Sequence, residues 1–170
     1  MGGPACLLWI PSGTRSATDL AIERMVRLIA IPAPWVNPRN FNTRDTRPIG
    51  GRLYAFAPPP YCSPDPHRDE GDELQIHDLF GFWPEPEPFA LGVCCNGEDD
   101  HRVLAEIAAH LAEETGGVID FGCLLPSAAE LPGRTAVVYW DGFAGCRPRT
   151  FLDGTAMRAW SRRPNCWMLK

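Results

Sequence analysis

Two adjacent cysteines, Cys94 and Cys95, lie six to seven residues before His101, and Asp120 follows later in the chain. A thiol, an imidazole and a carboxylate are the side chains that a thiol hydrolase needs. The cysteines also come just before a predicted helix, whose N-terminus lowers the pKa of a nearby thiol. The segment has no local signature of a known cysteine hydrolase, and free cysteines are more often small buried hydrophobic residues. We therefore keep a small thiol-dependent enzyme that uses Cys95 or Cys94 with His101 as an alternative.

The histidines do not predict a metal site. His101 and His110 are nine residues apart on one predicted helix, about 180° apart around its axis, so they cannot hold one ion together. His67 has Asp65 and Asp69 beside it, but such charges more often form a solvated cluster than a site with defined ligand geometry. The glycines of TGGVIDFG end a helix, whereas a phosphate site needs a loop that precedes one. We expect no bound metal and no cofactor.

Acidic residues are concentrated in the middle of the chain. From Asp65 to Asp100 there are eleven acids and one base, so this segment carries −10, whereas the whole chain carries −5. Asymmetry of this kind predicts the chemistry of a partner rather than a fold. It disfavours nucleic acid as a direct ligand of this segment and favours a basic protein. The alternative interface is the more basic N-terminal third, around Arg39, Arg44 and Arg47.

Prolines place much of this charge on a predicted exposed loop, residues 58–73, because repeated prolines exclude a helix or a central strand. Trp83 begins a second Pro-rich connector, WPEPEP. An exposed Trp there can anchor a partner, since Trp is enriched among the residues that dominate binding energy. The other interpretation is a Trp that fixes its loop to the domain. The predicted partner-binding residues are Asp65, Asp69, Glu70, Asp72, Glu73 and Trp83.

The clearest local signals predict a helix from about Gly97 to Thr115. Asn96 is a good N-cap, with Asp99 three residues later to return the hydrogen bond, and the Gly116–Gly117 pair ends the helix as a left-handed cap does. The following residues, 118–125, alternate as a strand in which Asp120 is expected to accept a hydrogen bond from a backbone amide or to cap a turn. In the predicted helix, the apolar residues at helical spacing form one buried face, made of Val103, Leu104, Ile107, Ala108 and Leu111.

The remaining elements follow from apolar runs and helix boundaries. A helix is predicted from Ser16 to Ala30, and a last one from an Asp153 cap through Arg162, with Leu152 and Met157 as a hydrophobic staple. Residues 32–50 are expected to form a loop. The pattern therefore predicts one α+β domain, residues 1–170, with three helices packed on a mostly antiparallel sheet of about six strands. Strands are predicted at 6–10, 50–57, 89–95, 135–141, 149–152 and, at an edge, 166–170.

Length and composition are those of a cytoplasmic globular domain. The chain has 170 residues, of which 45% are hydrophobic and 22% charged, as in an ordinary globular protein. No stretch reaches the roughly 18 apolar residues of a membrane span. The start, MGGPACLLWIP, lacks the basic region of a signal peptide. Seven cysteines, an odd number without a C-x-x-C pair, predict reduced thiols rather than a disulfide framework.

Three segments, CNGEDDHRVLAEIAAHLAEETGGVIDFG, DGTAMRAWSRRP and CWMLK, resemble those of a family of small uncharacterised bacterial proteins. Its members carry a CN-x-x-x-DH…GG-x-IDFG run and a C-terminal RAW…M-x-K. In this chain Cys123 stands where the family tends to have a second glycine, and Met157 where it tends to have Leu. The family is similar in type to the immunity proteins of bacterial polymorphic toxin systems. The resemblance implies a cognate toxin domain as the partner.

We therefore predict a non-enzymatic, immunity-type protein that binds and neutralises a cognate toxin domain. Its acidic surface would face a basic cleft of the toxin, where opposite charge speeds association and fixes the register. Neither nucleic acid nor a membrane is expected as a direct partner. A regulatory or structural binding subunit with a partner other than a toxin is a further alternative, beside the thiol-dependent enzyme.

Overall fold

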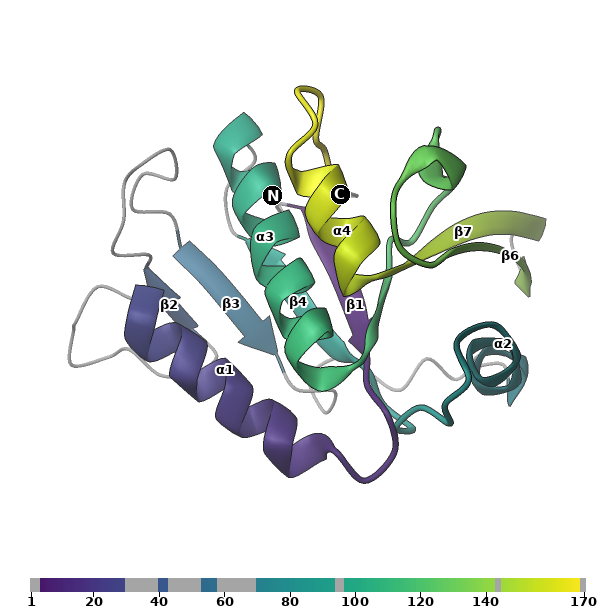
Figure 1. Cartoon of the computed structure of the whole chain (residues 1–170), viewed down its shortest axis with the longest axis horizontal. Coiled ribbons are helices and arrows are strands. Elements are labelled where there is room, and N and C mark those ends of the chain that lie inside the picture. The colour runs from purple at the N-terminus through teal and green to yellow at the C-terminus, as the bar shows by residue number, and fades with distance from the viewer. Residues whose placement is uncertain are drawn as a thin grey trace.

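The computed structural model describes residues 4–29, 40–42, 53–57, 70–93, 97–142 and 145–168. Within them, four α-helices pack on a seven-stranded sheet of order β2-β3-β4-β1-β5-β7-β6 (Figure 1). All neighbouring strands are antiparallel, which confirms the predicted α+β class. The strands are β1 Ala5–Trp9, β2 Asn40–Asn42, β3 Leu53–Ala57, β4 Phe89–Val93, β5 Val118–Asp120, β6 Thr135–Gly142 and β7 Gly145–Asp153. The helices are α1 Arg15–Ile29, α2 Glu70–Phe80, α3 Glu98–Thr115 and α4 Gly154–Ser161.

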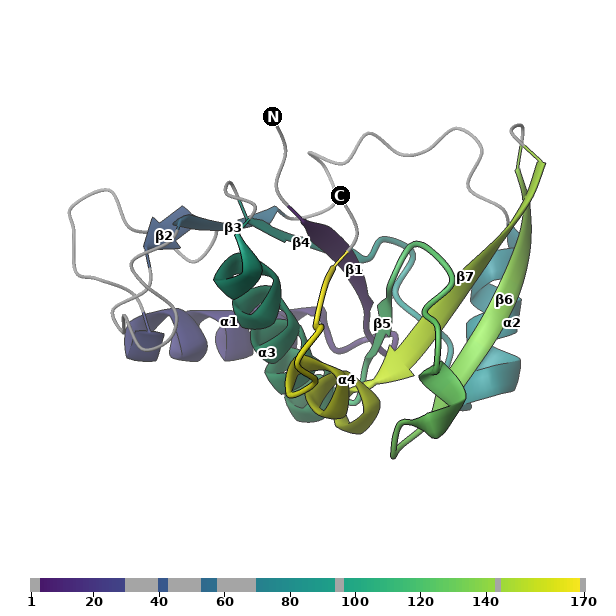
Figure 2. The same cartoon turned by 90° about the horizontal axis from the view of Figure 1, so that it is seen from above.

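The sheet separates two hydrophobic cores. In Figure 2, α1, α3 and α4 lie together along one side of the sheet, and α2 lies apart from them beside the β6–β7 end. The larger core joins α1, α3 and α4 to the sheet, and the smaller core lies under α2. Strand β1 contributes to both, because successive side chains of a strand point to opposite faces: Cys6 and Leu8 belong to the larger core and Trp9 to the smaller one.

Helix α3 confirms the predicted helix and its buried face. Ile107 is 6% exposed and Leu111 is fully buried, and Gly116 ends the helix in the left-handed conformation with φ of 69°. The predicted cap is wrong by one residue. Gly97 occupies the N-cap position, and its N–H donates to Asp100 Oδ2 at 2.6 Å. The expected hydrogen bond, from the N-cap N–H to a carboxylate three residues later, is therefore formed one residue further along the chain.

Helix α4 begins as predicted. Asp153 Oδ1 accepts a hydrogen bond from the Ala156 N–H at 2.8 Å, and Leu152 and Met157, on either side of this cap, are fully buried. Gly154 lets α4 approach α3 closely, because a Cβ at this position would lie 2.6 Å from the backbone nitrogen of Glu113. The two helices are therefore held in contact at the start of α4.

Three other predictions about the elements are wrong. The predicted loop at 32–50 contains β2, which pairs with β3. Strand β5 has only three residues, because the chain turns at Gly122, whose φ is 75°. Residues 166–168 are not a strand, although the Met168 N–H is fixed by a hydrogen bond to His101 Nδ1 at 2.7 Å.

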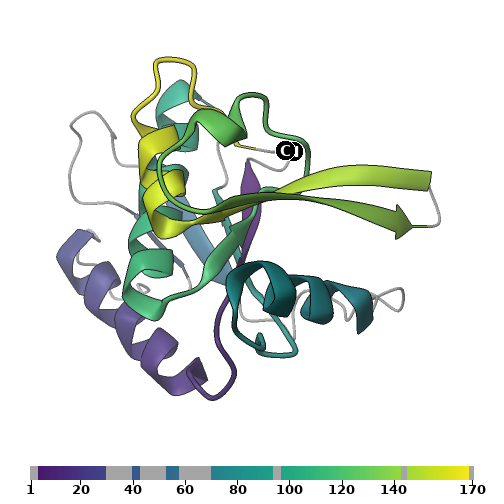
Figure 3. The ribbon, with the colours of Figure 1, turned by 45° about the vertical axis from the view of Figure 1, so that its right-hand side comes forward.

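Helix α2 was not predicted, since residues 58–73 were expected to form a loop. The helix begins at Glu70 and buries every fourth residue, Asp72, Ile76 and Phe80, against the sheet. Figure 3 shows it alongside the base of the long β6–β7 hairpin. None of the helices in the described part of the chain combines the length and apolar character needed to cross a membrane.

Candidate functional site

The outward side of α2 presents large apolar side chains together with acidic ones. Leu74 is 51% exposed, and Trp83, which follows the helix, is 53% exposed. Leu74 lies one turn from His77 and from Asp78, so these side chains are neighbours on the helix surface. We call this set, formed by Leu74, His77, Asp78 and Trp83, the α2 outer surface.

Trp83 is held in place although its ring is exposed. The indole stacks on the His77 imidazole with ring centroids 4.3 Å apart and an interplanar angle of 24°. The backbone carbonyl of Trp83 accepts a hydrogen bond from the Ser12 N–H at 2.8 Å, and the Glu85 N–H donates to the Ile10 carbonyl at 2.8 Å. The Pro-rich connector is therefore fastened to the segment after β1, and the ring is presented from a fixed backbone.

The acidic component of the α2 outer surface is Asp78. Its side chain is 67% exposed, and its Oδ1 lies 3.2 Å from His77 Nδ1. Glu73, five residues earlier on the helix, is half-buried. An exposed carboxylate beside an exposed aromatic ring is suited to a partner that offers both a cation and an apolar group.

The predicted partner-binding residues do not form one exposed loop. Asp65 and Asp69 lie outside the described residues, and Glu70 is the first residue of α2. Asp72 was expected on the surface, and this prediction is wrong: the residue is 8% exposed. Helical spacing turns Asp72 towards the sheet, together with Ile76. Of the predicted set, Trp83 has the exposure that was expected of it.

Asp72 belongs to a buried ionic cluster with Arg149 and Asp120, which we call the Arg149 cluster. Arg149 donates to Asp72 Oδ1 at 2.6 Å and to Asp120 Oδ2 at 2.8 Å. The side chain of Arg149 is 15% exposed, that of Asp72 11% and that of Asp120 2%. Burial raises the pKa of Asp120, against the opposing effects of Arg149 and of the Gly122 N–H, which donates to Asp120 Oδ1 at 2.8 Å. The cluster connects α2 to β5 and β7.

Arg134 holds the other end of α2. Its guanidinium donates to the Phe80 carbonyl at 3.0 Å and also to the Leu79 carbonyl. The last carbonyls of a helix have no partner within the helix, so a guanidinium satisfies them well. The sequence contains no local signal for this contact, because Arg134 lies 54 positions after Phe80.

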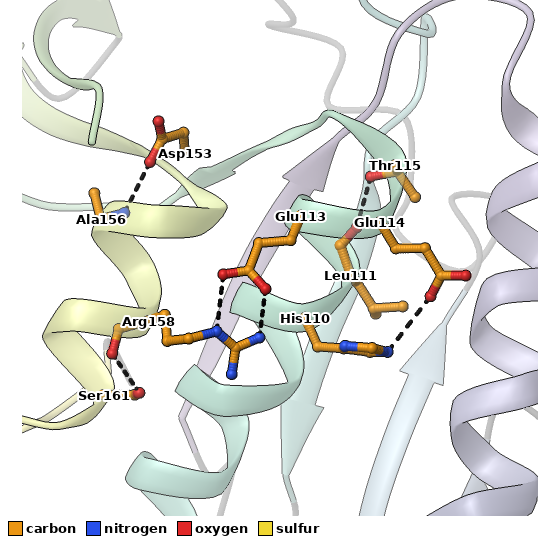
Figure 4. Close-up of polar contacts among 9 residues, drawn as sticks. All are labelled: His110, Leu111, Glu113, Glu114, Thr115, Asp153, Ala156, Arg158 and Ser161. Carbon is orange, nitrogen blue, oxygen red and sulfur yellow. Dashed lines mark hydrogen bonds and ion pairs between the residues drawn. The ribbon is translucent and has the colours of Figure 1, made fainter. Parts of the chain in front are cut away.

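The residues of the alternative thiol site have other contacts. His101 Nδ1 accepts from the Met168 N–H, and Asp120 binds Arg149 and the Gly122 N–H, the backbone contact expected for it. Cys94 and Cys95 lie outside the described residues, so the thiol-dependent enzyme stays a prediction. His110, on another side of α3, is exposed with its Nε2 3.4 Å from Glu114 Oε2 (Figure 4).

Three other cysteines are free thiols with raised pKa values. Cys6 and Cys166 are buried, and Cys123 is half-buried. Burial raises the pKa of Cys166 to about 11 and also raises those of Cys6 and Cys123. Since the thiolate is the reactive form, these thiols are poor nucleophiles at neutral pH.

A pocket of about 340 Å³ opens where α3 ends and α4 begins. Its wall includes the aromatic residues Phe80 and Phe82 and the backbone of three glycines, and Glu113, Arg134 and Asp153 bring charge to it. Figure 4 shows Glu113 of α3 facing Arg158 of α4. The guanidinium donates to the two carboxylate oxygens at 2.8 and 2.6 Å, and these hydrogen bonds lower the pKa of Glu113.

The chain belongs to DUF6368, a family of unknown function, which it matches over residues 2–170. No curated protein and no solved structure matches it significantly. The family assigns no activity, so the choice among a toxin-binding protein, another binding subunit and a thiol-dependent enzyme depends on the site itself.

Proposed function

For this member of a family of unknown function, we propose the role of an immunity-type protein that binds a basic toxin domain through the α2 outer surface and neutralises it in the cytoplasm. The observation that carries the proposal is Trp83, a 53% exposed indole on a fixed backbone that stacks on His77, which also contacts the exposed carboxylate of Asp78. Trp combines a large apolar area with a polar N–H, and it is enriched among the residues that dominate binding energy.

The rigidity of this surface favours binding. Ordering one flexible side chain on association costs roughly 0.5–1.5 kcal/mol. The His77 ring already limits the positions of Trp83, and backbone hydrogen bonds on both sides hold the connector. The Arg149 cluster and Arg134 hold the two ends of α2 on the sheet. Trp83 is therefore already ordered in the free protein, so binding adds little further entropic cost for ordering this side chain.

The charge of the segment supports a basic partner. The span from Asp65 to Asp100 carries −10, and Asp78 places part of that charge next to the anchor. Exposed charges of one sign raise the association rate with an oppositely charged partner, and salt screens this effect. A toxin domain that acts on nucleic acids or nucleotides commonly has a basic cleft, and an acidic surface that covers the cleft would exclude its substrate.

Co-expression in bacteria tests the proposal. The probe is the toxin domain encoded by the gene next to that of this chain, produced from an inducible promoter. The wild-type chain is expected to restore growth and to co-purify with the domain, whereas the Trp83→Ala/Asp78→Asn variant is expected to lose both effects. The matched control is Leu20→Ala/Asp19→Asn on α1, where Leu20 is 57% exposed and Asp19 is also exposed. Equal protection by the two variants would contradict the proposal.

A further inference from the structure

We propose that the pocket between the end of α3 and the start of α4 receives an arginine side chain of the partner. This inference rests on the proposed function and adds a second contact point to it. The pocket lies next to the α2 outer surface, because Phe80 and Phe82 line it and Trp83 is the next residue in the chain. A partner seated on Trp83 is therefore within reach of it.

The size of the pocket suits one long side chain. Its volume of about 340 Å³ is near the lower end of the roughly 300–1,000 Å³ of sites that hold whole small molecules. Gly116, Gly117 and Gly154 leave backbone rather than side chains along part of the wall. Two of these glycines are required by packing, since a Cβ at Gly117 would lie 2.4 Å from the Trp9 carbonyl oxygen and one at Gly154 2.6 Å from the Glu113 nitrogen.

The apolar part of the pocket suits the stem and the flat face of an arginine. Phe80, Phe82 and Val118 supply aromatic and aliphatic surface. Arginine lays its methylene groups along apolar surface and stacks its guanidinium on aromatic rings. A guanidinium–aromatic contact of this kind already occurs at the edge of the pocket, where the Arg134 guanidinium lies 5.3 Å from the centroid of the Phe80 ring.

The charges around the pocket favour a cation. Two carboxylates, Glu113 and Asp153, and one guanidinium, Arg134, line the pocket. The Arg134 guanidinium already donates to α2 carbonyls, and the two oxygens of Asp153 accept from the Ala156 and Arg134 N–H groups. Helix α3 has no basic residue of its own in its last turn, so the negative end of its dipole also favours a cation here. The positive end of α4 is already capped by Asp153. Glu113 binds Arg158, but a carboxylate has about four acceptor sites and can accept from a second guanidinium.

The experiment is an NMR titration of the full chain with acetyl-Gly-Arg-Gly-amide. The matched probe replaces Arg by citrulline, which keeps the shape and removes the charge. The arginine peptide is expected to shift the amide signals of Gly116, Gly117 and Thr155 in a saturable way. The citrulline peptide is expected to bind about tenfold more weakly, the loss expected for one charge-assisted hydrogen bond. No shift at these amides, or equal shifts with the two peptides, would overturn the inference.

Two variants locate the binding. Glu113→Gln is expected to weaken the binding of the arginine peptide several-fold. Glu114, one residue further along α3, is not part of the pocket lining, so Glu114→Gln is expected to leave the binding unchanged. Asp78→Asn is also expected to leave peptide binding unchanged, because it alters only the α2 outer surface. Loss of growth protection in Asp78→Asn/Trp83→Ala without loss of peptide binding would separate the two proposals. If Asp78→Asn abolished peptide binding, the peptide would bind at the α2 outer surface, and the inference about the pocket would be wrong.

Discussion

Arg149→Met removes the cation of the Arg149 cluster while it keeps an apolar side chain of similar length. Arg149 contacts Asp72 and Asp120 at 2.6 and 2.8 Å, and the three side chains are 15% exposed or less. Removal of one partner from a buried ion pair costs about 3–5 kcal/mol, because a charge is left buried without compensation. Since Arg149 and Asp72 are not fully buried, we expect a loss of about 3–4 kcal/mol. For a chain of this size that corresponds to a decrease in Tm of roughly 6–16 °C.

The pH dependence identifies the cause of this loss. Burial already raises the pKa of Asp120 above 3.8, and Arg149 is the largest opposing contribution. Without Arg149 the pKa of Asp120 in the folded state rises further. A raised folded-state pKa favours the protonated folded protein, so the deficit of the variant is largest at pH 7 and shrinks as the pH falls towards about 4.

Urea denaturation followed by tryptophan fluorescence and circular dichroism measures these effects. Arg147→Met, at an exposed position on the same strand, is the control and is expected to change stability by less than about 0.5 kcal/mol. The triple variant Asp72→Asn/Asp120→Asn/Arg149→Met is expected to recover more than half of the loss, because no buried charge remains. A loss below about 1 kcal/mol, or the same loss at pH 7 and near pH 4, would refute the reasoning.

Three further predictions follow from the structure. Trp83→Ala is expected to raise the dissociation rate of the partner by a cost of roughly 2 kcal/mol or more, measured by surface plasmon resonance, with exposed Leu20→Ala as an unchanged control. Gly154→Ala is expected to cost roughly 1–3 kcal/mol through overpacking against α3, whereas Gly92→Ala, whose Cβ would have its nearest neighbour at 3.7 Å, lacks this clash; thermal melts compare them. Because the pKa of Cys166 is raised from 9.0 to about 11, the free energy of unfolding is expected to fall from pH 9 to 11, and less so in Cys166→Ala.

The helices with local boundary signals were predictable from the sequence. Asp153 with its hydrophobic staple marks the start of α4, and the glycine pair after Thr115 marks the end of α3. These signals act within one or two turns of the chain, so they need no knowledge of the tertiary structure. The N-cap of α3 was displaced by one residue because Asp100 provides the same hydrogen bond as the expected Asp99.

Helix α2 could not be predicted in the same way. One of its core positions is the acidic residue Asp72, whose partner Arg149 lies 77 positions away. Its C-terminal carbonyls are satisfied by Arg134, which is also remote in sequence. The burial of a carboxylate depends on such long-range partners, and neither of them leaves a local pattern. For this reason the composition of the segment indicated a solvated loop, and Asp72 was assigned to the surface.

The central claim, that the α2 outer surface binds a basic partner, is tested most directly by association kinetics. The Asp78→Asn variant is compared with Asp19→Asn, which removes the same charge from an exposed position on α1. The partner is the toxin domain that the chain neutralises in the co-expression assay. We predict a several-fold slower association for the α2 variant at about 0.01 M salt, where the Debye length is about 30 Å, and near-equal rates at about 1 M. Equal association rates of the two variants at low salt would contradict the claim.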